Sequence, residues 1–348
     1  MKTGNISQIG LNLKNNVIAE PLLLTLIPTH KCTASCDGCC FSATPKVEHI
    51  MSYEMMAKHI DEVLDFSPSL QVVVITGGEC FLLEDHLDEI VYYITKKGLK
   101  SRVVTNAYWA SSYNNAYKRL QSLKEKGLTE INFSTGDYHQ KFIDFQNIIN
   151  AIKVAVDLEF TPLYIAIEGD FENSFTENNM KNHPDLKELI DDKKMFLTTG
   201  KWLAMNNIQK VVSPSKNEFS DKCDERCENI FKGITINPYS QLLACCGISV
   251  EHNKYLKIGN LQEYSLNSLY NRQFNDLFKT WLYTHGPKYI YERIKEESRQ
   301  QTLYFSHQCA YCMEVIKEEN VLILKKIISK YIPIIMYQIQ IMSEYEKY

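Results

Sequence analysis

The sequence predicts an α/β protein in which a parallel sheet is followed by a smaller, cysteine-rich module. Short apolar segments alternate with amphipathic helical patterns over residues 21–213. Polar or glycine-rich residues follow several of these apolar segments directly, and the cysteines gather in clusters. Alternating strands and helices of this length indicate right-handed βαβ units and a parallel sheet.

The strands and helices are expected in a regular order. Apolar, β-branched segments predict six strands, at 22–28, 71–76, 101–105, 130–134, 162–168 and near 207–212. Helical periodicity predicts helices between these strands, at 84–97, 114–126 and 143–157. Functional residues of such folds lie at the carboxyl ends of the strands.

A different pattern begins after Pro214. Residues 234–244 predict a β-hairpin with its turn at 237–240, and helical stretches near 265–298 precede a CxxC pair. The last apolar stretch contains Lys325, Lys326 and Lys330, so we expect an amphipathic helix rather than a membrane span. The predicted segments are an extension (1–20), the sheet domain (21–213), the cysteine-rich module (214–318) and a C-terminal helical segment (319–348).

The net charge and the first twenty residues argue against two classes of protein, nucleic-acid-binding and secreted proteins. The 38 basic and 42 acidic residues give a net charge of −4, which argues against a broad nucleic-acid interface. The first twenty residues lack the apolar core of a secretory signal. A cytoplasmic location is therefore expected, and the eleven clustered cysteines indicate metal ligands rather than disulfides.

The first cluster has the spacing CxxxCxxC at Cys32, Cys36 and Cys39, followed directly by Cys40. Three thiolates on one loop can hold three irons of a [4Fe–4S] cubane and leave the fourth iron open to S-adenosylmethionine (SAM). A zinc site that uses Cys40 as the fourth ligand is the alternative.

Together with the sequence TGGE at 76–79, this loop resembles the signature of the radical SAM superfamily. The resemblance implies a partial (β/α)6, TIM-like barrel and an external electron donor of the flavodoxin or ferredoxin type. It implies that Gly77, Gly78 and Glu79 contact the amino group of SAM, although Cys80 replaces the proline common after that glutamate. Four further residues at strand ends are candidates to bind SAM or substrate, with turn or capping roles as alternatives: Asn106, Ser134, Asp137 and Glu168.

The later cysteines resemble those of a SPASM or twitch-type extension that holds an auxiliary [4Fe–4S] cluster. Cys309 and Cys312 have metal-binding spacing, and Cys227 and Cys245 would complete four ligands. Cys223 could replace Cys227, Cys246 could replace Cys245, and a structural zinc site is the alternative.

The adjacent pair Cys245-Cys246 suggests a reaction. Neighbouring side chains on an extended segment point apart, so Cys246 could be a spare thiol that gives a hydrogen atom to a substrate radical. The chain resembles peptide epimerases that make D-residues in ribosomally synthesised peptides, in which a cysteine has this role. A peptide substrate and Cα epimerisation are therefore expected. The alternatives are thioether or carbon–carbon crosslinking, side-chain oxidation, or a non-catalytic iron–sulfur or zinc module.

Overall fold

The computed structural model describes residues 4–161, 163–169, 174–201, 212–213 and 221–345. The chain divides into two compact units, and each is described by itself. The core unit consists of Leu23–Asn206 with Asn237–Tyr239. The C-terminal unit consists of Met1–Leu22, Asn207–Ile236 and Ser240–Tyr348, so it also includes the first helix.

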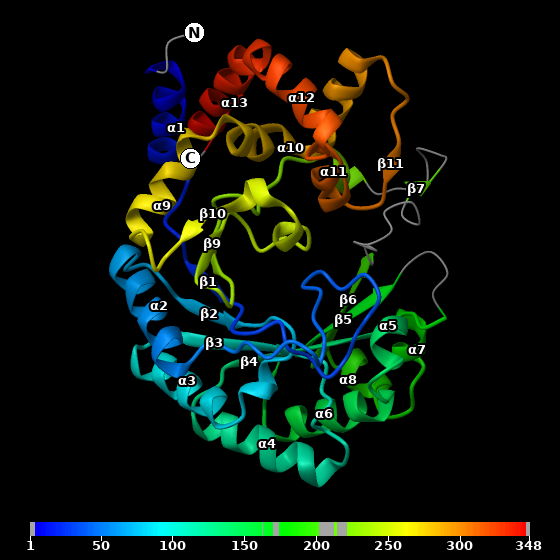
Figure 1. Ribbon diagram of the computed structural model, residues 1–348. Helices are drawn as coiled ribbons and strands as arrows, with labels where there is room; N and C mark the ends of the chain where they lie inside the picture. The colour runs from blue at the N-terminus through cyan, green and yellow to red at the C-terminus, as the bar shows by residue number, and fades with distance from the viewer. Residues whose placement is uncertain (1–3, 162, 170–173, 202–211, 214–220, 346–348) are drawn as a thin grey trace. The chain divides into compact units, whose positions relative to one another are not determined.

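The core unit is built on six parallel strands whose spatial order is their chain order (Figure 1). They are β1 (Leu23–Leu26), β2 (Val72–Ile75), β3 (Lys100–Thr105), β4 (Glu130–Gly136), β5 (Leu163–Gly169) and β6 (Met195–Lys201). This order requires a crossover after each strand, which is the pattern of a (β/α) barrel. The predicted partial (β/α)6 barrel is confirmed.

Helices fill the crossovers and pack on one face of the sheet (Figure 1). They are α2 (Tyr53–Phe66), the 3₁₀ helix η1 (Cys80–Leu83), α3 (Asp85–Lys96), α4 (Tyr113–Glu125), α5 (Asp137–Gln140), α6 (Phe145–Asp157), α7 (Glu177–Lys181) and α8 (Lys187–Asp191). Side-chain caps begin three of the longer ones: Ser52, Ser112 and Asp144 each accept a hydrogen bond from a backbone N–H of the first turn.

The sixth strand lies earlier in the chain than the sequence suggested. Strand β6 spans Met195–Lys201 and pairs with β5, whereas the expected strand was near 207–212. Of that segment, 207–211 lie outside the described residues, and Val212 belongs to a short strand of the other unit. Residues 195–201 contain two threonines and a glycine, so they lack the continuous apolar run used to recognise the other strands.

The C-terminal unit combines an antiparallel meander with helices. Its strands are β7 (Val212–Ser213), β8 (Ile234–Ile236), β9 (Gln241–Leu243), β10 (Lys257–Asn260) and β11 (Tyr304–Phe305). Its helices are α1 (Gly4–Asn16), η4 (Asp221–Asp224), η5 (Val250–His252), η6 (Lys254–Leu256), α9 (Leu266–Arg272), η7 (Gln273–Asn275), α10 (Leu277–Ser298), α11 (Gln308–Val315), α12 (Glu318–Ile327), η8 (Ile328–Tyr331) and α13 (Ile332–Tyr345). The predicted hairpin is present, with Thr235 opposite Leu243.

Helix α10 organises this unit. Its buried Trp281 and Tyr291 pack against rings of neighbouring segments, Tyr331 and Tyr311. At Gly286 the backbone leaves the helical path with φ +79°, and a Cβ there would lie 2.2 Å from the carbonyl oxygen of Glu225. Glycine is required by both the backbone angle and the close approach. No helix among the described residues has the length and apolarity needed to cross a membrane.

Candidate active site

The first cysteine cluster forms a compact loop after β1. Cys32 is buried with Ala34 and Ala43, and Cys36, Cys39 and Phe41 pack against them. The backbone N–H of Cys39 donates to the carbonyl of Cys36 (3.2 Å), and that of Cys32 donates to Thr44 (3.2 Å). The three predicted cluster ligands are thereby held on one short, folded loop.

The TGGE turn lies against the segment that leads into this loop. The N–H groups of Gly78 and Glu79 donate to the carbonyls of Thr29 (2.9 Å) and Lys31 (2.8 Å). A Cβ at Gly77 would lie 2.5 Å from the Thr29 oxygen, and one at Gly78 would lie 2.1 Å from the Lys31 oxygen. Because glycine has no Cβ, the backbone of this turn can approach the carbonyls of Thr29 and Lys31, directly before the cysteine loop.

Glu79 is 1% exposed, and its carboxylate links this turn to the end of β3. Oε1 accepts hydrogen bonds from Phe81 N (3.0 Å) and Thr105 Oγ1 (2.8 Å), and Oε2 accepts from Asn106 N (2.9 Å). Burial raises the pKa of Glu79 to about 7, although these hydrogen bonds oppose the shift. Because these donors enclose the carboxylate, it fixes the TGGE turn against the end of β3.

Asn106, a predicted site residue, reaches the cysteine loop. Its Nδ2 lies 3.6 Å from the Sγ of Cys32 and 3.3 Å from Thr33 Oγ1. An amide N–H beside a cluster thiolate is a donor of the kind that tunes iron–sulfur sites. The geometry brings Asn106, Glu79 and Cys32 together, as their places at strand ends suggested.

Sequence reasoning missed Thr105 and Trp109. Thr105 Oγ1 donates to Glu79, accepts from Ala107 N (3.1 Å), and lies 3.1 Å from Trp109 Nε1. The Trp109 ring stacks on Phe81 at 4.4 Å between centroids. Both residues fall within the run TNAYW, but a strand-terminal threonine and a tryptophan are each common in cores, so the pattern gave no reason to select them.

Cys39 and Cys40 differ in their acidity. A hydrogen bond from Cys40 lowers the pKa of Cys39, and the same bond together with burial raises the pKa of Cys40. This arrangement favours the thiolate at Cys39, the form that binds iron, and keeps Cys40 protonated. Burial raises the pKa values of Cys32 and Cys36 to about 11 and about 12, so iron binding would have to displace their protons.

Three other predicted residues lie at the ends of β4 and β5. Asp137 accepts from Ser174 N (2.8 Å), Ser174 Oγ (2.6 Å) and Phe175 N (3.0 Å), so it caps that segment. Ser134 is paired in register with Ala166 on β5. Glu168 has a side chain that is 34% exposed, and its Oε2 lies 3.9 Å from His139 Nδ1. Desolvation of the carboxyl group raises the pKa of Glu168 to about 7, and the charge of nearby Cys39 adds to the shift.

In the C-terminal unit, the later cysteines come together from three segments. A Cβ at Gly247 would lie 3.3 Å from the Sγ of Cys309 and 3.4 Å from that of Cys245, so both sulfur atoms adjoin this glycine. Asn253 Nδ2 donates to the Sγ of Cys312 (3.4 Å). Burial raises the pKa of Cys227 to about 11, and the charge of nearby Cys309 adds to the shift.

The remaining two cysteines differ from these four. Cys223 is buried, and its thiol lies 3.7 Å from the carbonyl oxygen of Phe305. Cys246 is exposed whereas its neighbour Cys245 is buried. This contrast favours Cys245 as the ligand and leaves the thiol of Cys246 accessible.

Both thiol sets fit iron–sulfur clusters in their chemistry. The donors are all soft sulfur atoms, and amide groups of Asn106 and Asn253 lie beside one sulfur in each set. Over the ranges that the structure describes, no three Cys, His, Asp or Glu side chains gather as ligands of a single metal ion. A cubane needs no such convergence, because each thiolate binds a different iron.

The comparisons agree with this geometry. Residues 26–174 match the sequence model of the Radical SAM superfamily. The cysteine loop, the TGGE turn and Asn106 all lie within this segment.

Two curated relatives have recognisable sequence similarity. The chain is 28% identical over 161 residues to YydG of Bacillus subtilis (strain 168), a protein named for peptide biosynthesis, across 46% of this chain and 48% of YydG. It is 27% identical over 165 residues to a Methanocaldococcus jannaschii protein named as a probable GTP 3′,8-cyclase, across 44% of this chain and 51% of that protein. The chain spans about half the length of the curated relatives it matches.

The fold is similar to that of native anSMEcpe, solved with bound AdoMet and the Cp18Cys peptide. The TM-score is 0.51 at 14% sequence identity, and the match covers 90% of this chain and 99% of anSMEcpe. At this identity the similarity concerns the fold alone.

Proposed function

We propose that this protein is a radical SAM enzyme that epimerises residues of a ribosomally made peptide from L to D. One observation supports the proposal that the chain binds SAM at an iron–sulfur cluster. Two backbone hydrogen bonds join the TGGE turn to Thr29 and Lys31, directly before the CxxxCxxC loop, while Glu79 accepts from the backbone of Asn106, whose side chain reaches Cys32. A passive metal-binding module has no need of this second motif.

Cys32, Cys36 and Cys39 would hold a SAM-binding [4Fe–4S] cluster, and the four thiols of Cys227, Cys245, Cys309 and Cys312 would hold an auxiliary one. When bound, the first cluster and SAM would supply the chemistry for removing a hydrogen atom from the substrate, by way of a 5′-deoxyadenosyl radical, with an electron from a flavodoxin or ferredoxin type donor. The chain's own part is to fix the loop, exclude water and deliver a hydrogen atom.

Gly77 and Gly78 are proposed to offer backbone groups to the amino group of SAM. Ser134, Asp137 and Glu168 remain proposed SAM or substrate contacts. The Glu168 side chain is more available than that of Asp137, because Asp137 already accepts three hydrogen bonds from Ser174 and Phe175. The peptide substrate is supported by the similarity to YydG, which is named for peptide biosynthesis.

Cys246 is proposed as the hydrogen-atom donor. After the substrate loses Hα, the thiol S–H bond breaks and a new Cα–H bond forms on the opposite face. A second electron from the flavodoxin or ferredoxin type donor and a proton from solvent would then restore the thiol from its radical. The exposed position of Cys246, next to a buried proposed ligand, supports this role.

The test uses anaerobically reconstituted protein, SAM, dithionite and the peptide encoded by a short reading frame beside the gene. We expect 5′-deoxyadenosine and a product of unchanged mass that contains a D-residue. In D₂O the product should gain one deuterium at Cα. A product that has lost two hydrogen atoms would instead indicate a thioether or carbon–carbon crosslink or a side-chain oxidation.

Replacing Cys246 with alanine should leave 5′-deoxyadenosine formation intact and eliminate the D-residue. Cys223→Ala is the matched control, because Cys223 is buried against Phe305. Normal epimerisation by the Cys246 variant would contradict the proposed donor, and absence of 5′-deoxyadenosine in the unaltered protein would contradict the radical SAM function itself.

A further inference from the structure

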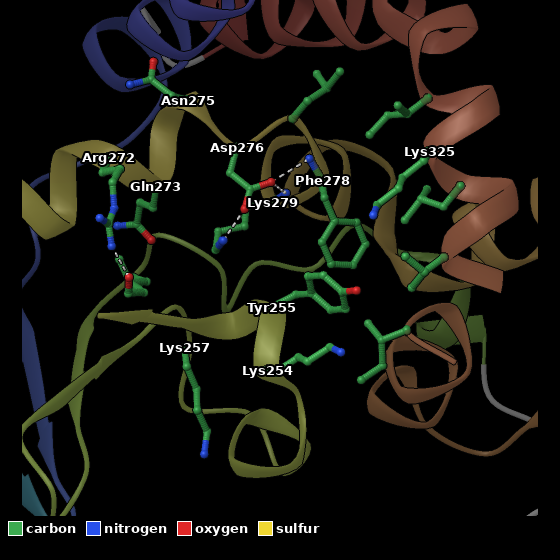
Figure 2. A pocket seen from close by; sticks show the side chains of 16 residues that line it. Lys254, Tyr255, Lys257, Arg272, Gln273, Asn275, Asp276, Phe278, Lys279 and Lys325 are labelled. Atoms are coloured by element: carbon green, nitrogen blue, oxygen red, sulfur yellow. Dashed lines mark hydrogen bonds and ion pairs between the residues drawn. The ribbon is translucent and has the colours of Figure 1, made fainter. Parts of the chain in front are cut away.

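The C-terminal unit contains a pocket that the proposed chemistry does not use (Figure 2). Its volume is about 630 Å³, within the usual range for ligand sites. Residues from η6, β10, η7, α10 and α12 line it. All of these elements belong to the one compact unit.

The middle of the pocket is apolar. Figure 2 shows the rings of Tyr255 and Phe278 next to each other, and their centroids are 6.4 Å apart. Val321 and Leu324 of α12 contribute aliphatic side chains. A large apolar side chain of a ligand could therefore be removed from water here, which is the main source of affinity in such sites.

The rim of the pocket is positively charged. Lys254 and Lys325 are exposed cations on different elements. Lys257, which pairs with Glu251, and Arg272, which donates to the carbonyl of Ile258, also line the pocket. Of the residues that line the pocket, only Asp276 is acidic, and it forms an ion pair with Lys279 while capping α10. The pocket is thus apolar inside and cationic at its edge.

The pocket also contains a buried hydrogen-bond acceptor, which a ligand would need to satisfy. Gln273 is 3% exposed and lines the pocket, and its Oε1 atom is buried without a hydrogen-bond partner in the structure. A buried acceptor left unsatisfied costs roughly 1–3 kcal/mol. A ligand N–H would satisfy it.

We propose that this pocket binds an acidic segment of the peptide substrate, an inference that rests on the proposed peptide-modifying function. An apolar side chain lies against Tyr255, Phe278 and Leu324. Flanking carboxylates pair with Lys254 and Lys325, and a backbone N–H donates to Gln273 Oε1. A peptide supplies all three features at once, whereas a fatty acid or an anionic lipid has no N–H to offer.

The test measures fluorescence anisotropy of a fluorescein-labelled probe, Glu-Leu-Glu-Phe-Leu-Glu-amide, on the full chain with its clusters reconstituted. The second probe has lysine in place of each glutamate. We expect the acidic probe to bind, the basic probe not to bind, and the affinity to fall with added salt. The double variant Lys254→Glu with Lys325→Glu should weaken binding about tenfold.

Lys326→Glu is the matched control, because Lys326 neighbours Lys325 on α12 but does not line the pocket. It should bind the acidic probe as the unaltered protein does. Gln273→Met should weaken binding about threefold to tenfold without lowering the melting temperature, since it removes an unsatisfied acceptor rather than a native hydrogen bond.

Equal affinities of the double variant and the Lys326→Glu control would overturn the pocket assignment, as would preferential binding of the basic probe. Preference for vesicles of phosphatidylglycerol over the acidic probe would also overturn it. Failure of the proposed function gives a different result: the acidic probe binds as expected, but the same preparation forms no 5′-deoxyadenosine from SAM and dithionite.

Discussion

The two cysteine sets are assembled in different ways. The first set lies on one loop, Cys32–Cys39, that is folded on itself, and the segment directly before it is joined to the TGGE turn by backbone hydrogen bonds. The second draws on three segments: the loop at Cys227, the connection between β9 and β10 at Cys245, and helix α11 with Cys309 and Cys312. The first set is thus a local motif, and the second exists only when the C-terminal unit has folded. Loss of ligands should therefore have different consequences in the two places.

The largest effect is expected at the first set. Replacing Cys32, Cys36 and Cys39 together with alanine should abolish SAM cleavage and remove one cluster's worth of iron, because these thiols are the proposed ligands. Iron analysis and 5′-deoxyadenosine assay measure both. The control is Cys40→Ala, which should retain cleavage because Cys40 is proposed to remain a thiol. Loss of the cluster in this control alone would contradict the ligand assignment.

A second variant pair tests the contrast between the sets. Purified anaerobic protein should carry about two [4Fe–4S] clusters. Cys309→Ala with Cys312→Ala should lose one of them, keep SAM cleavage and lower the melting temperature, because metal ligation contributes to the folding of the C-terminal unit. Stoichiometric zinc together with one cluster's worth of iron would identify the second set as a structural zinc site.

A smaller and purely steric change tests how the first loop is held. Gly78→Ala would place a Cβ 2.1 Å from the Lys31 oxygen, so the turn must shift away from the cysteine loop. We expect destabilisation of about 1–3 kcal/mol and markedly weaker SAM binding. Thermal melting and SAM titration measure these. Gly200→Ala is the control, since a Cβ there meets nothing within 4 Å; equal effects of the two would refute the role of this close contact.

The smallest expected effect concerns pH. Burial raises the pKa of Glu79 from 4.5 to about 7. Between these pH values the folded chain holds a proton that the unfolded chain has released, so stability should decrease as pH rises through this window. The full shift corresponds to about 3 kcal/mol.

Glu79→Gln should lose this pH dependence while being less stable at pH 5, because the amide NH₂ that replaces Oε2 cannot accept a hydrogen bond from Asn106 N. Melting temperatures at pH 5 and pH 8 compare the two proteins without added metal. A wild-type curve that runs parallel to the glutamine variant would mean that Glu79 titrates as an ordinary exposed carboxyl.

The contrast between the sets also explains what the sequence could predict. CxxxCxxC and TGGE are contiguous motifs, so the loop and the fold around it were recognisable from spacing and periodicity. The role of Thr105 as a partner of Glu79 was not, because that contact joins two residues 26 positions apart, one in the turn after β2 and one at the end of β3. Strand β6 was misplaced because its polar residues hide the apolar signal, and the pocket beside α12 has no local pattern at all.

The packing of helix α1 has a consequence for how the chain is made. A Cβ at Gly10 would lie 2.0 Å from the carbonyl oxygen of Phe274, and Lys14 Nζ donates to Asn271 Oδ1, a residue 257 positions later. At about 5–20 residues per second, a ribosome needs on the order of tens of seconds to cover that distance. Throughout this interval the apolar side chains of Ile9, Leu13 and Val17, buried in the finished protein, have no surface to pack on. The nascent chain therefore exposes this apolar segment through most of its synthesis, and transiently exposed apolar surface is what chaperones bind.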